Sequence, residues 1–381
     1  MTFPTISHFL ESCTGIFIPL PIQTFGFFIA LAFLIGHYFI KQEFLRLEKT
    51  RILNSITLKN QENIFFILID YFFNGILGFF FGFKIIYIIN NYTLFVANPQ
   101  QTILSSNGNI FIGLIFLILT LTHLYYSKKK ESKEIKKEIL PSELSWNFIF
   151  IAGLSGIIGA KLFSVFEDID YLISNPLDAL FSFSGLTFYG GLIFGTIAVI
   201  MYGKKYNIKT VYLADIFAPS LILAYGVGRM GCHFSGDGDW GIIANMNNKP
   251  VFIPDWLWGY NFPHNVIEAG EKIEGCVGMY CNQLPYLVYP TSLYESIFAV
   301  LAFLFLYNIK TYIKIPGLLF CIYLILNGIE RFLIEIIRVT EKYMFLGLNI
   351  TQAQIIGILI TILGLIGIFY LKKQYHEPIQ E

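Results

Sequence analysis

Charged side chains are scarce in this chain of 381 residues, where they make up 14% of the sequence. A typical soluble domain carries about 25% charged residues. Hydrophobic residues make up 55%, and the mean hydropathy is +0.62. A soluble protein of this size cannot bury that much apolar surface in one core. The composition therefore excludes most soluble enzyme folds and intrinsic disorder, and it indicates an integral membrane protein.

Several other features are missing from the sequence. The 26 basic residues are balanced by 26 acidic ones, which argues against a nucleic-acid partner. Five cysteines are too few for a disulfide scaffold, although the spacing of Cys276 and Cys281 leaves a local disulfide open. The Cys232–His233 pair is too small a ligand set for zinc, so we expect no metal. Residues 1–20 contain no Lys or Arg, so we expect no signal peptide.

Long apolar runs take the place of the missing charge. A run of about 20 residues can cross the roughly 30 Å of hydrocarbon in a bilayer. Backbone polar groups have to be paired in lipid, so we expect these runs to be helices, and they are too continuous for a barrel. We predict an all-α polytopic membrane protein with about nine transmembrane helices, at 17–40, 64–89, 109–126, 147–166, 186–202, 211–228, 292–308, 316–336 and 352–371.

The positions of the basic residues predict the topology of these spans. Eighteen of the 26 Lys and Arg residues follow the first, third, fifth, seventh and ninth spans. By the positive-inside rule, the N-terminus then lies outside and the C-terminus lies in the cytoplasm. The long polar stretch 229–291 faces outside and is expected to form a small extracytoplasmic head. It separates a first membrane part at 1–228, with six spans, from a second at 292–381, with three.

The first motif that could carry out chemistry lies where the sixth span ends. Gly228 and Arg229 are followed by MGCHFSGDGDWG, which ends at Gly241 and contains Asp237 and Asp239. Glycines allow a close approach of the backbone to a ligand, and a guanidinium offers a fork of donors to a phosphate. The alternative is an arginine that anchors the topology before a Gly-rich turn. The length of the Gly/Asp string favours a functional site.

Two further motifs begin expected spans. Tyr189 is followed by Gly190 and Gly191, which permit close contact with a lipid headgroup or a peptide, or alternatively the packing of two helices. Tyr294 and Glu295 begin the seventh span. Glu295 is either a site carboxylate or a helix-start carboxylate that the helix dipole favours.

The last motif lies at the end of the eighth span. Arg331 and Glu335 are four residues apart, so they share a helix face and can pair, and Arg338 follows on a similar face. Such a pair can be purely structural. Together with Arg229, however, it predicts arginines and carboxylates that converge near the outer leaflet. Such a site could bind a phospholipid headgroup and stabilise a phosphate leaving group.

Taken together and in this order, the motifs resemble those of bacterial prolipoprotein diacylglyceryl transferases. GRMGCHFSGDGDWG is similar to the signature segment of that family, FYGG to its HGG-type segment, YPTSLYE to its HP-x-x-LYE segment and RFLIE to its R-x-x-x-E segment. QTFGFFIALAFLIG resembles its first span. The resemblance covers 22–48 and 147–371. It implies a core of seven helices, to which the spans at 64–89 and 109–126 are additional.

The resemblance implies a transferase. The family moves diacylglyceryl from phosphatidylglycerol to the lipobox cysteine of a preprolipoprotein, so that a thioether forms and glycerol phosphate leaves. It implies no cofactor. The partners would be phosphatidylglycerol, other membrane lipid and preprolipoprotein signal peptides, and we expect a monomer in the bacterial cytoplasmic (inner) membrane. By position, the predicted catalytic residues are Arg229, Arg331, Tyr189, Glu335, Asp237 and Asp239, and the predicted substrate-binding residues are Gly190, Gly191, Gly228, Tyr294, Glu295 and Gly241.

The chain departs from the family pattern at several of these positions. Tyr189 stands where the family has a histidine, Phe25 replaces a tyrosine, and Cys232 replaces an asparagine. The signature glutamate corresponds to Asp237 or Asp239. A tyrosine has a pKa of about 10 and is a poor base unless nearby arginines lower its pKa. The proton acceptor is therefore open between Tyr189, a carboxylate and water. A transporter of an anionic solute and an inactive lipid-binding relative stay open as alternative functions.

Overall fold

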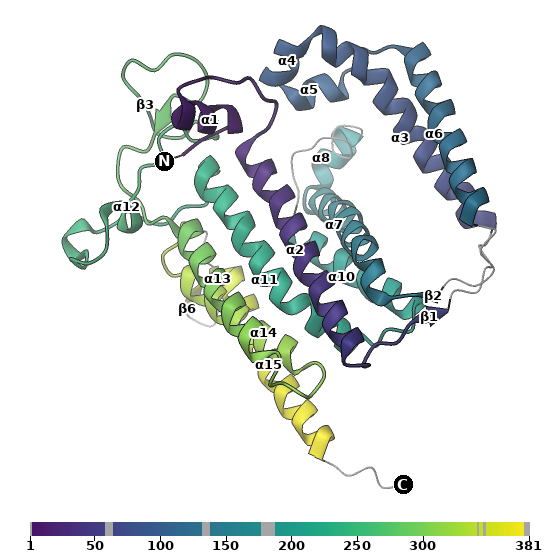
Figure 1. Ribbon diagram of the computed structural model, residues 1–381. Coiled ribbons are helices and arrows are strands. Elements are labelled where there is room, and N and C mark those ends of the chain that lie inside the picture. Colours follow the sequence, from purple (N-terminus) through teal and green to yellow (C-terminus); the bar gives the residue numbers. More distant parts are fainter. Residues whose placement is uncertain are drawn as a thin grey trace. The chain divides into compact units, whose positions relative to one another are not determined.

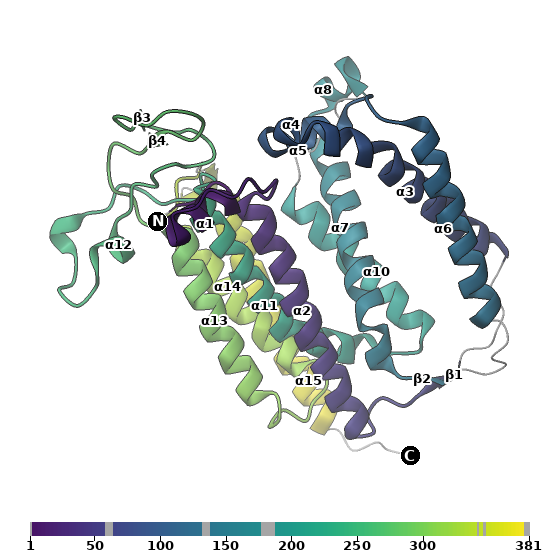
Figure 2. The same ribbon diagram turned by 45° about the horizontal axis from the view of Figure 1, so that its top comes forward.

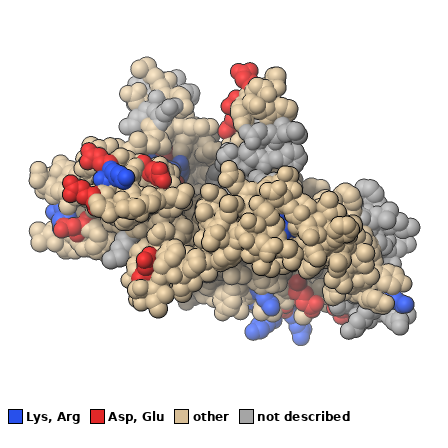
Figure 3. All heavy atoms as spheres, turned by 90° about the horizontal axis from the view of Figure 1, so that it is seen from above, with Lys and Arg blue, Asp and Glu red and all other residues tan. Residues whose placement is uncertain are grey.

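The computed structural model describes residues 2–57, 64–131, 138–176, 187–340, 343–345 and 348–376. It is almost entirely helical (Figures 1 and 2). The chain forms two compact units. The first comprises Met1–Ile18, Ile22–Leu53 and Leu144–Glu381, and the second comprises Pro19–Pro21 and Asn54–Glu143. The surface in Figure 3 is mostly uncharged, with charged side chains gathered in a few small groups.

The second unit is a helical hairpin with short helices at its tip. Its elements are β1 (Ile56–Thr57), α3 (Ile64–Asn90), α4 (Tyr92–Ala97), α5 (Pro99–Leu104), α6 (Ile110–Glu131) and β2 (Glu138–Ile139). Helices α3 and α6 pack closely at Gly82, which has no side chain. A Cβ at this position would lie only 2.6 Å from the Ile112 carbonyl oxygen. The buried Lys84 donates to the Thr102 and Asn107 carbonyl oxygens, at 3.2 and 2.9 Å. This buried lysine therefore holds the short helices in place.

The first unit contains the remaining helices. They are α1 (Ile6–Thr14), α2 (Thr24–Lys49), α7 (Ser145–Glu167), α8 (Ile169–Ser174), α10 (Phe188–Lys205), α11 (Thr210–Ser235), α12 (Asp255–Trp258), α13 (Thr291–Ile309), α14 (Leu318–Ile334) and α15 (Gln352–His376). Helix α11 packs against α2, α13 and α14. The Ser296 hydroxyl donates to the Gly226 carbonyl oxygen at 2.8 Å, and Ile222, Ala299 and Leu306 form part of the core between these helices.

The other ends of these helices are tied by a second set of polar contacts. The carboxylate of Asp215, near the start of α11, accepts the backbone N–H groups of Gly317 and Phe320 at 2.6 and 2.9 Å. These donors belong to the first turn of α14. Glu43, near the end of α2, is buried and pairs with Lys310 just after α13 and with Arg46. The start of α14 is thereby tied to α11, and the end of α2 is tied to the end of α13.

Each of the nine expected spans coincides with a helix. Seven of the described helices are long and apolar enough to cross a membrane: α2, α3, α6, α7, α11, α13 and α15. Helices α10 and α14 have 18 and 17 residues and are not among them. The first span was expected at 17–40, but α2 runs from Thr24 to Lys49. Pro19 and Pro21 precede it, and the pairing of Glu43 allows its charged end to remain helical.

The polar stretch between α11 and α13 forms a head with a small core of its own. Phe262, Leu284 and Val288 are buried there, and Trp240 and Tyr260 pack against them. Two short strands, β3 (Glu271–Lys272) and β4 (Asn282–Gln283), pair antiparallel, and Cys276 and Cys281 between them form a disulfide. After the head, β5 (Tyr343–Phe345) and β6 (Leu348–Ile350) form a hairpin before α15.

Candidate active site

Helix α11 extends further along the chain than expected and includes a residue of the candidate site. The sixth span was expected to stop at residue 228, but α11 continues to Ser235 and ends at Gly236, whose φ is 64°. That left-handed conformation is accessible to glycine at little cost and lets its N–H bond the Cys232 carbonyl oxygen. Arg229 is therefore a helical residue inside the bundle, held by the rigid scaffold rather than by a loop.

A buried carboxylate lies at the centre of the site. Glu295, in the first turns of α13, has a side chain that is 0% exposed. Arg229 Nε donates to its Oε2 atom. Arg331 NH1 lies 3.5 Å and Arg338 NH1 lies 3.8 Å from its Oε1 atom. Three guanidinium groups from three segments thus surround one carboxylate. We call Arg229, Arg331 and Arg338 with Asp239, Glu295 and Glu335 the arginine cluster.

Asp239 links two of these arginines on the side of the head. One of its carboxylate oxygens pairs with Arg229 NH1 and the other with Arg338 NH2. Burial by itself would raise the pKa of Asp239, but the two guanidinium groups outweigh this and hold the pKa below its usual value. Asp239 is therefore ionised at neutral pH and balances part of the arginine charge.

Gly241 brings together the segments that carry these charges. Its N–H donates to the Tyr289 carbonyl oxygen at 2.8 Å, and Gly241 pairs with Arg338 in an isolated bridge. A Cβ at this position would lie 2.6 Å from the Ile337 carbonyl oxygen and 2.9 Å from Thr291 Cγ2. Only glycine permits that approach without a shift of the backbone. Gly241 thus positions these segments, because only a residue without a side chain fits between them.

The cluster retains donors for an anion. The NH2 atom of Arg229 is buried and has no hydrogen-bond partner among the described residues. Arg331 is the most exposed of the three arginines, at 28%, and its contacts are the loosest. Its NH2 atom lies 3.4 Å from Glu335 Oε2, and its NH1 atom lies 3.5 Å from Glu295. Guanidinium donors of this kind match the oxygens of a phosphate.

Tyr189 lies at the start of α10 and belongs to the same neighbourhood. It is partly buried, and the charges of Arg331, Glu335 and Arg338 act on its hydroxyl group. The two glycines that follow it face another helix. A Cβ on Gly190 would overlap the Gly159 carbonyl oxygen of α7, and one on Gly191 would lie 3.2 Å from that of Gly156. Helix packing thus accounts for both glycines, and their contact with substrate stays a prediction.

Gly228 and Tyr294 have surroundings of their own. A Cβ on Gly228 would have Ile29 Cδ1 as its nearest neighbour, at 3.7 Å, which is an ordinary contact. The Tyr294 hydroxyl donates to the Leu257 carbonyl oxygen at 2.6 Å, so it ties α13 to the head. Their roles in substrate binding are not tested by these contacts and stay predictions.

Asp237 lies beside the cluster, where three potential metal ligands meet. The ligand atoms of Cys232, Asp237 and Asp239 all lie within 4.8 Å of one another. Arg229 NH1 lies 3.4 Å from the Cys232 sulfur, and Asp239 uses both carboxylate oxygens in ion pairs with arginines. A cation at this place would be repelled by two guanidinium groups at close range. The donor set therefore does not fit a metal well.

The sequence missed two charged residues of this neighbourhood as site residues. Arg338 contacts both Glu295 and Asp239. Its spacing of seven residues from Arg331 predicted a shared helix face, but α14 ends at Ile334 and Arg338 instead forms a bridge with Gly241. Glu330 is 6% exposed, and its Oε1 atom is buried without a hydrogen-bond partner among the described residues. The sequence feature that could have identified Glu330 is its position within an apolar run, because a carboxyl group is costly in a membrane.

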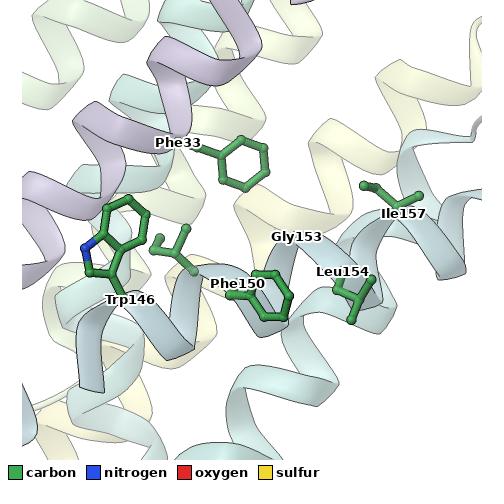
Figure 4. A pocket seen from close by; sticks show the side chains of 7 residues that line it. Phe33, Trp146, Phe150, Gly153, Leu154 and Ile157 are labelled. Atoms are coloured by element: carbon green, nitrogen blue, oxygen red, sulfur yellow. The ribbon is translucent and has the colours of Figure 1, made fainter. Parts of the chain in front are cut away.

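A separate apolar pocket of about 320 Å³ lies between α2 and α7 (Figure 4). Phe33 of α2 and residues of α7 from Trp146 to Ile157 line it. None of the six charged members of the arginine cluster takes part in it, and its lining is almost entirely apolar. The pocket is therefore distinct from the polar site.

Comparison with known proteins agrees with the resemblance of the motifs. A family model described as "Prolipoprotein diacylglyceryl transferase" matches residues 110–370. Proteins from Staphylococcus aureus strains MSSA476 and Newman are each 32% identical to the chain over 234 residues. The match covers 61% of this chain and 76% of each relative, and both are named phosphatidylglycerol–prolipoprotein diacylglyceryl transferase. All six members of the arginine cluster lie within the residues that the family model matches.

Proposed function

The chain belongs to the prolipoprotein diacylglyceryl transferase family, and we propose that its arginine cluster carries out the reaction of that family. The names of the relatives specify phosphatidylglycerol as one substrate and a prolipoprotein as the other. This chain is accordingly a transferase of lipoprotein maturation that acts on phosphatidylglycerol. The family assignment favours this function over the transport of an anionic solute.

The reaction is a substitution at a glycerol carbon. The sulfur of the lipobox cysteine forms a C–S bond to the carbon that carries the phosphate ester, and the C–O bond to that phosphate breaks. The bonding electrons leave with glycerol phosphate, and the proton of the thiol passes to a base or to water. Negative charge develops on the leaving phosphate, so the transition state gains from fixed positive charge nearby.

The observation that carries the proposal is the set of three guanidinium groups around the buried Glu295 carboxylate. Arg331 is the most exposed of them, and one terminal nitrogen of Arg229 has no hydrogen-bond partner within the described part of the chain, so these two would contact the phosphate of the lipid. Arg338 would keep Asp239 in place beside Arg229. Water is largely excluded around Glu295, which strengthens the attraction between the arginines and the phosphate.

The proton of the thiol has two candidate acceptors close to Arg331. Tyr189 occupies the position of the family histidine. Its burial opposes the ionised form and outweighs the charges of Arg331 and Arg338, which favour that form, so Tyr189 would act as a base only where bound substrate changes this balance. Glu335 is 1% exposed and pairs with Arg331. A bell-shaped pH profile of transfer that loses one limb in Tyr189→Phe would assign the proton to Tyr189. An unchanged profile would leave it to Glu335 or water.

The location and topology follow from the same arrangement. The arginine cluster lies at the end of α11 and the start of α13, whereas Lys204, Lys205 and Lys310 lie at the opposite helix ends. The positive-inside rule supports a cytoplasmic C-terminus and an outward-facing cluster. We propose a multi-pass protein of the bacterial cytoplasmic (inner) membrane that works as a monomer. The head, expected at 229–291, would lie outside between the end of α11 at Ser235 and the start of α13 at Thr291, with the flanking parts in the membrane.

Replacement of Arg331 by alanine tests the proposal. We expect purified Arg331→Ala in vesicles to lose transfer from labelled phosphatidylglycerol to a lipobox peptide by a factor of about 100 or more. Arg46→Ala is the matched control, because Arg46 is similarly exposed and also pairs with a buried glutamate, but at the other end of the helices. Transfer by Arg331→Ala at the level of the control would overturn the assignment of the site.

A second assay separates the transferase from an inactive relative. The chain should support growth of a bacterial strain depleted of its own prolipoprotein diacylglyceryl transferase. Failure to do so, with the protein present in the membrane at normal amounts, would favour the inactive lipid-binding alternative.

A further inference from the structure

An exposed apolar tip projects from the head beside the start of α13 (Figures 1 and 2). It is formed by the segment 249–258, which includes the short helix α12. Val251 is 99% exposed, Phe252 86% and Trp256 58%. We call these three residues the apolar tip. Large apolar side chains that are this exposed and this close in the sequence are typical of a contact surface.

The segment that carries the apolar tip is internally braced. Lys249 Nζ donates to the Ile253 carbonyl oxygen at 2.7 Å and pairs with Asp255 at 3.0 Å. These are the only two charged side chains in 249–258, and each neutralises the other. Indole Nε1 of Trp258 donates to the Asn245 carbonyl oxygen at 2.9 Å. The tip is thus presented by a fixed, electrically neutral loop.

A hydrogen bond sets the depth of this loop relative to the membrane helices. The Tyr294 hydroxyl donates to the Leu257 carbonyl oxygen at 2.6 Å, and Tyr294 lies in the first turn of α13. Helix α13 is one of the helices that are long and apolar enough to cross a membrane. The apolar tip is therefore held at the level where a membrane span begins, which is the boundary between lipid and water.

Helix α13, to which the segment of the apolar tip is bonded, has an exposed apolar surface of its own. Along α13, exposed apolar side chains recur at Ile297, Leu301, Leu304 and Phe305, where a spanning helix would contact acyl chains. Tryptophan is enriched at the headgroup level because its ring is apolar and its N–H is polar. All the features of the segment match the interface of a bilayer.

We propose that the apolar tip inserts into the headgroup–acyl boundary of the lipid bilayer and anchors the head there. The partner is lipid, and the contact is separate from the reaction at the arginine cluster. Because Glu295 directly follows Tyr294, this anchor would fix the head next to the site. A signal peptide of a prolipoprotein is the competing occupant of such a surface, and the experiment has to distinguish the two.

Site-specific photo-crosslinking in the full chain tests the proposal. A photoreactive phenylalanine analogue is introduced at Phe252 and, as a matched control, at Val277. Val277 is 96% exposed and apolar as well, but it lies in the disulfide-closed turn between β3 and β4, away from the span ends (Figure 2). The protein is placed in vesicles of phosphatidylglycerol and phosphatidylethanolamine, with and without a lipobox peptide.

We expect light to add the mass of one phospholipid to the chain labelled at position 252 and not to the chain labelled at position 277. The peptide should leave the lipid adduct at position 252 unchanged. Equal lipid adducts at both positions, or none at either, would overturn the proposal. An adduct of position 252 with the peptide in place of lipid would also overturn it and would assign the tip to the second substrate.

Discussion

At the scale of single residues, Glu295 determines how the arginines are arranged. It is fully buried and contacts Arg229, Arg331 and Arg338. Without this carboxylate the three guanidinium groups would repel one another at close range. Removal of one partner from a buried ion pair is strongly destabilising, because it leaves an uncompensated charge. We therefore expect each member of the cluster to contribute to stability, in addition to any part it has in the proposed reaction.

Asp239 predicts how stability depends on pH. The pKa of Asp239 is lowered in the folded protein, so its ion pairs stabilise the fold above its unfolded pKa of about 3.9. This contribution is lost as the pH falls through the lower folded value. We expect the melting temperature of wild type to exceed that of Asp239→Asn at pH 7, and this difference to shrink as the pH is lowered below about 4. Thermal unfolding of both proteins in the same detergent measures it.

A difference in melting temperature that stays constant from neutral to acidic pH would contradict the role of the Asp239 charge. Asp170→Asn, a change at an exposed aspartate of α8, is the control and should follow the wild-type curve throughout.

Gly241 predicts a steric effect on the site. A side-chain methyl group there would clash with the Ile337 carbonyl oxygen, which is backbone and cannot rotate away. We expect Gly241→Ala to lower the free energy of unfolding by about 1–3 kcal/mol and to separate Asp239 from Arg338. Transfer activity should fall with it. Gly36→Ala is the control, because the nearest atom to its Cβ would be Ala224 Cβ at 3.9 Å. Equal stability and activity in the two variants would refute the steric argument.

The residue types of the site were predictable, but their partners were only partly so. Arg229, Arg331 and Glu335 followed from motifs and from helix spacing. The spacing rule pairs residues of one helix, and it therefore gave the Arg331–Glu335 contact at 3.4 Å. The shared contact of Arg331 with Glu295 joins two helices, and the contact of Asp239 with Arg338 joins the head to the segment that follows α14. Such contacts arise only from packing, which no local pattern encodes.

At the scale of elements, α14 is positioned by contacts at both of its ends. Arg331 and Glu335 lie at its C-terminal end, and Asp215 of α11 accepts the N–H groups of Gly317 and Phe320 at its beginning. The first N–H groups of a helix have no partner within it, so a carboxylate there stabilises it. The orientation of Arg331 thus depends on a residue at the far end of the bundle.

Removal of this contact should weaken the bundle. We expect Asp215→Ala to lower the free energy of unfolding by about 2 kcal/mol, because it breaks two charge-assisted hydrogen bonds to backbone N–H groups. Denaturant-induced unfolding in detergent, followed by tryptophan fluorescence, measures the loss. Asp170→Ala on the exposed side of α8 provides the baseline for losing an aspartate. A loss no larger than that of the control would contradict the role of Asp215 as a cap.

Helices were more predictable than the head because hydropathy identifies apolar runs directly. Their ends were less predictable. The sixth span was expected to end before Arg229, because an arginine is costly in lipid. In the structure Glu295 and Asp239 neutralise Arg229, so α11 continues to Gly236. The pairing of β3 with β4 and the buried position of Phe262 depend on contacts across the head, where the sequence has no regular period.

At the scale of the whole molecule, the proposed topology can be measured by labelling. We expect Asn247→Cys in the head to react with a membrane-impermeant maleimide in intact cells, and Lys372→Cys at the end of α15 to react only after permeabilisation. Both positions are exposed. The variants should be made in a Cys13→Ser background, because Cys13 is the exposed free cysteine. The reverse labelling pattern would invert the topology.

The arginine cluster is balanced by its own carboxylates, and this has a consequence for selectivity. Three arginines face Asp239, Glu295 and Glu335, so an incoming anion has to exchange with a counter-ion that is already tethered in place. A small anion from solution competes poorly with a tethered group. A phospholipid is confined to the bilayer by its chains and reaches the site at a high effective concentration. If the cluster binds the lipid phosphate as proposed, its built-in counter-ions would therefore favour lipid-borne phosphate over free phosphate.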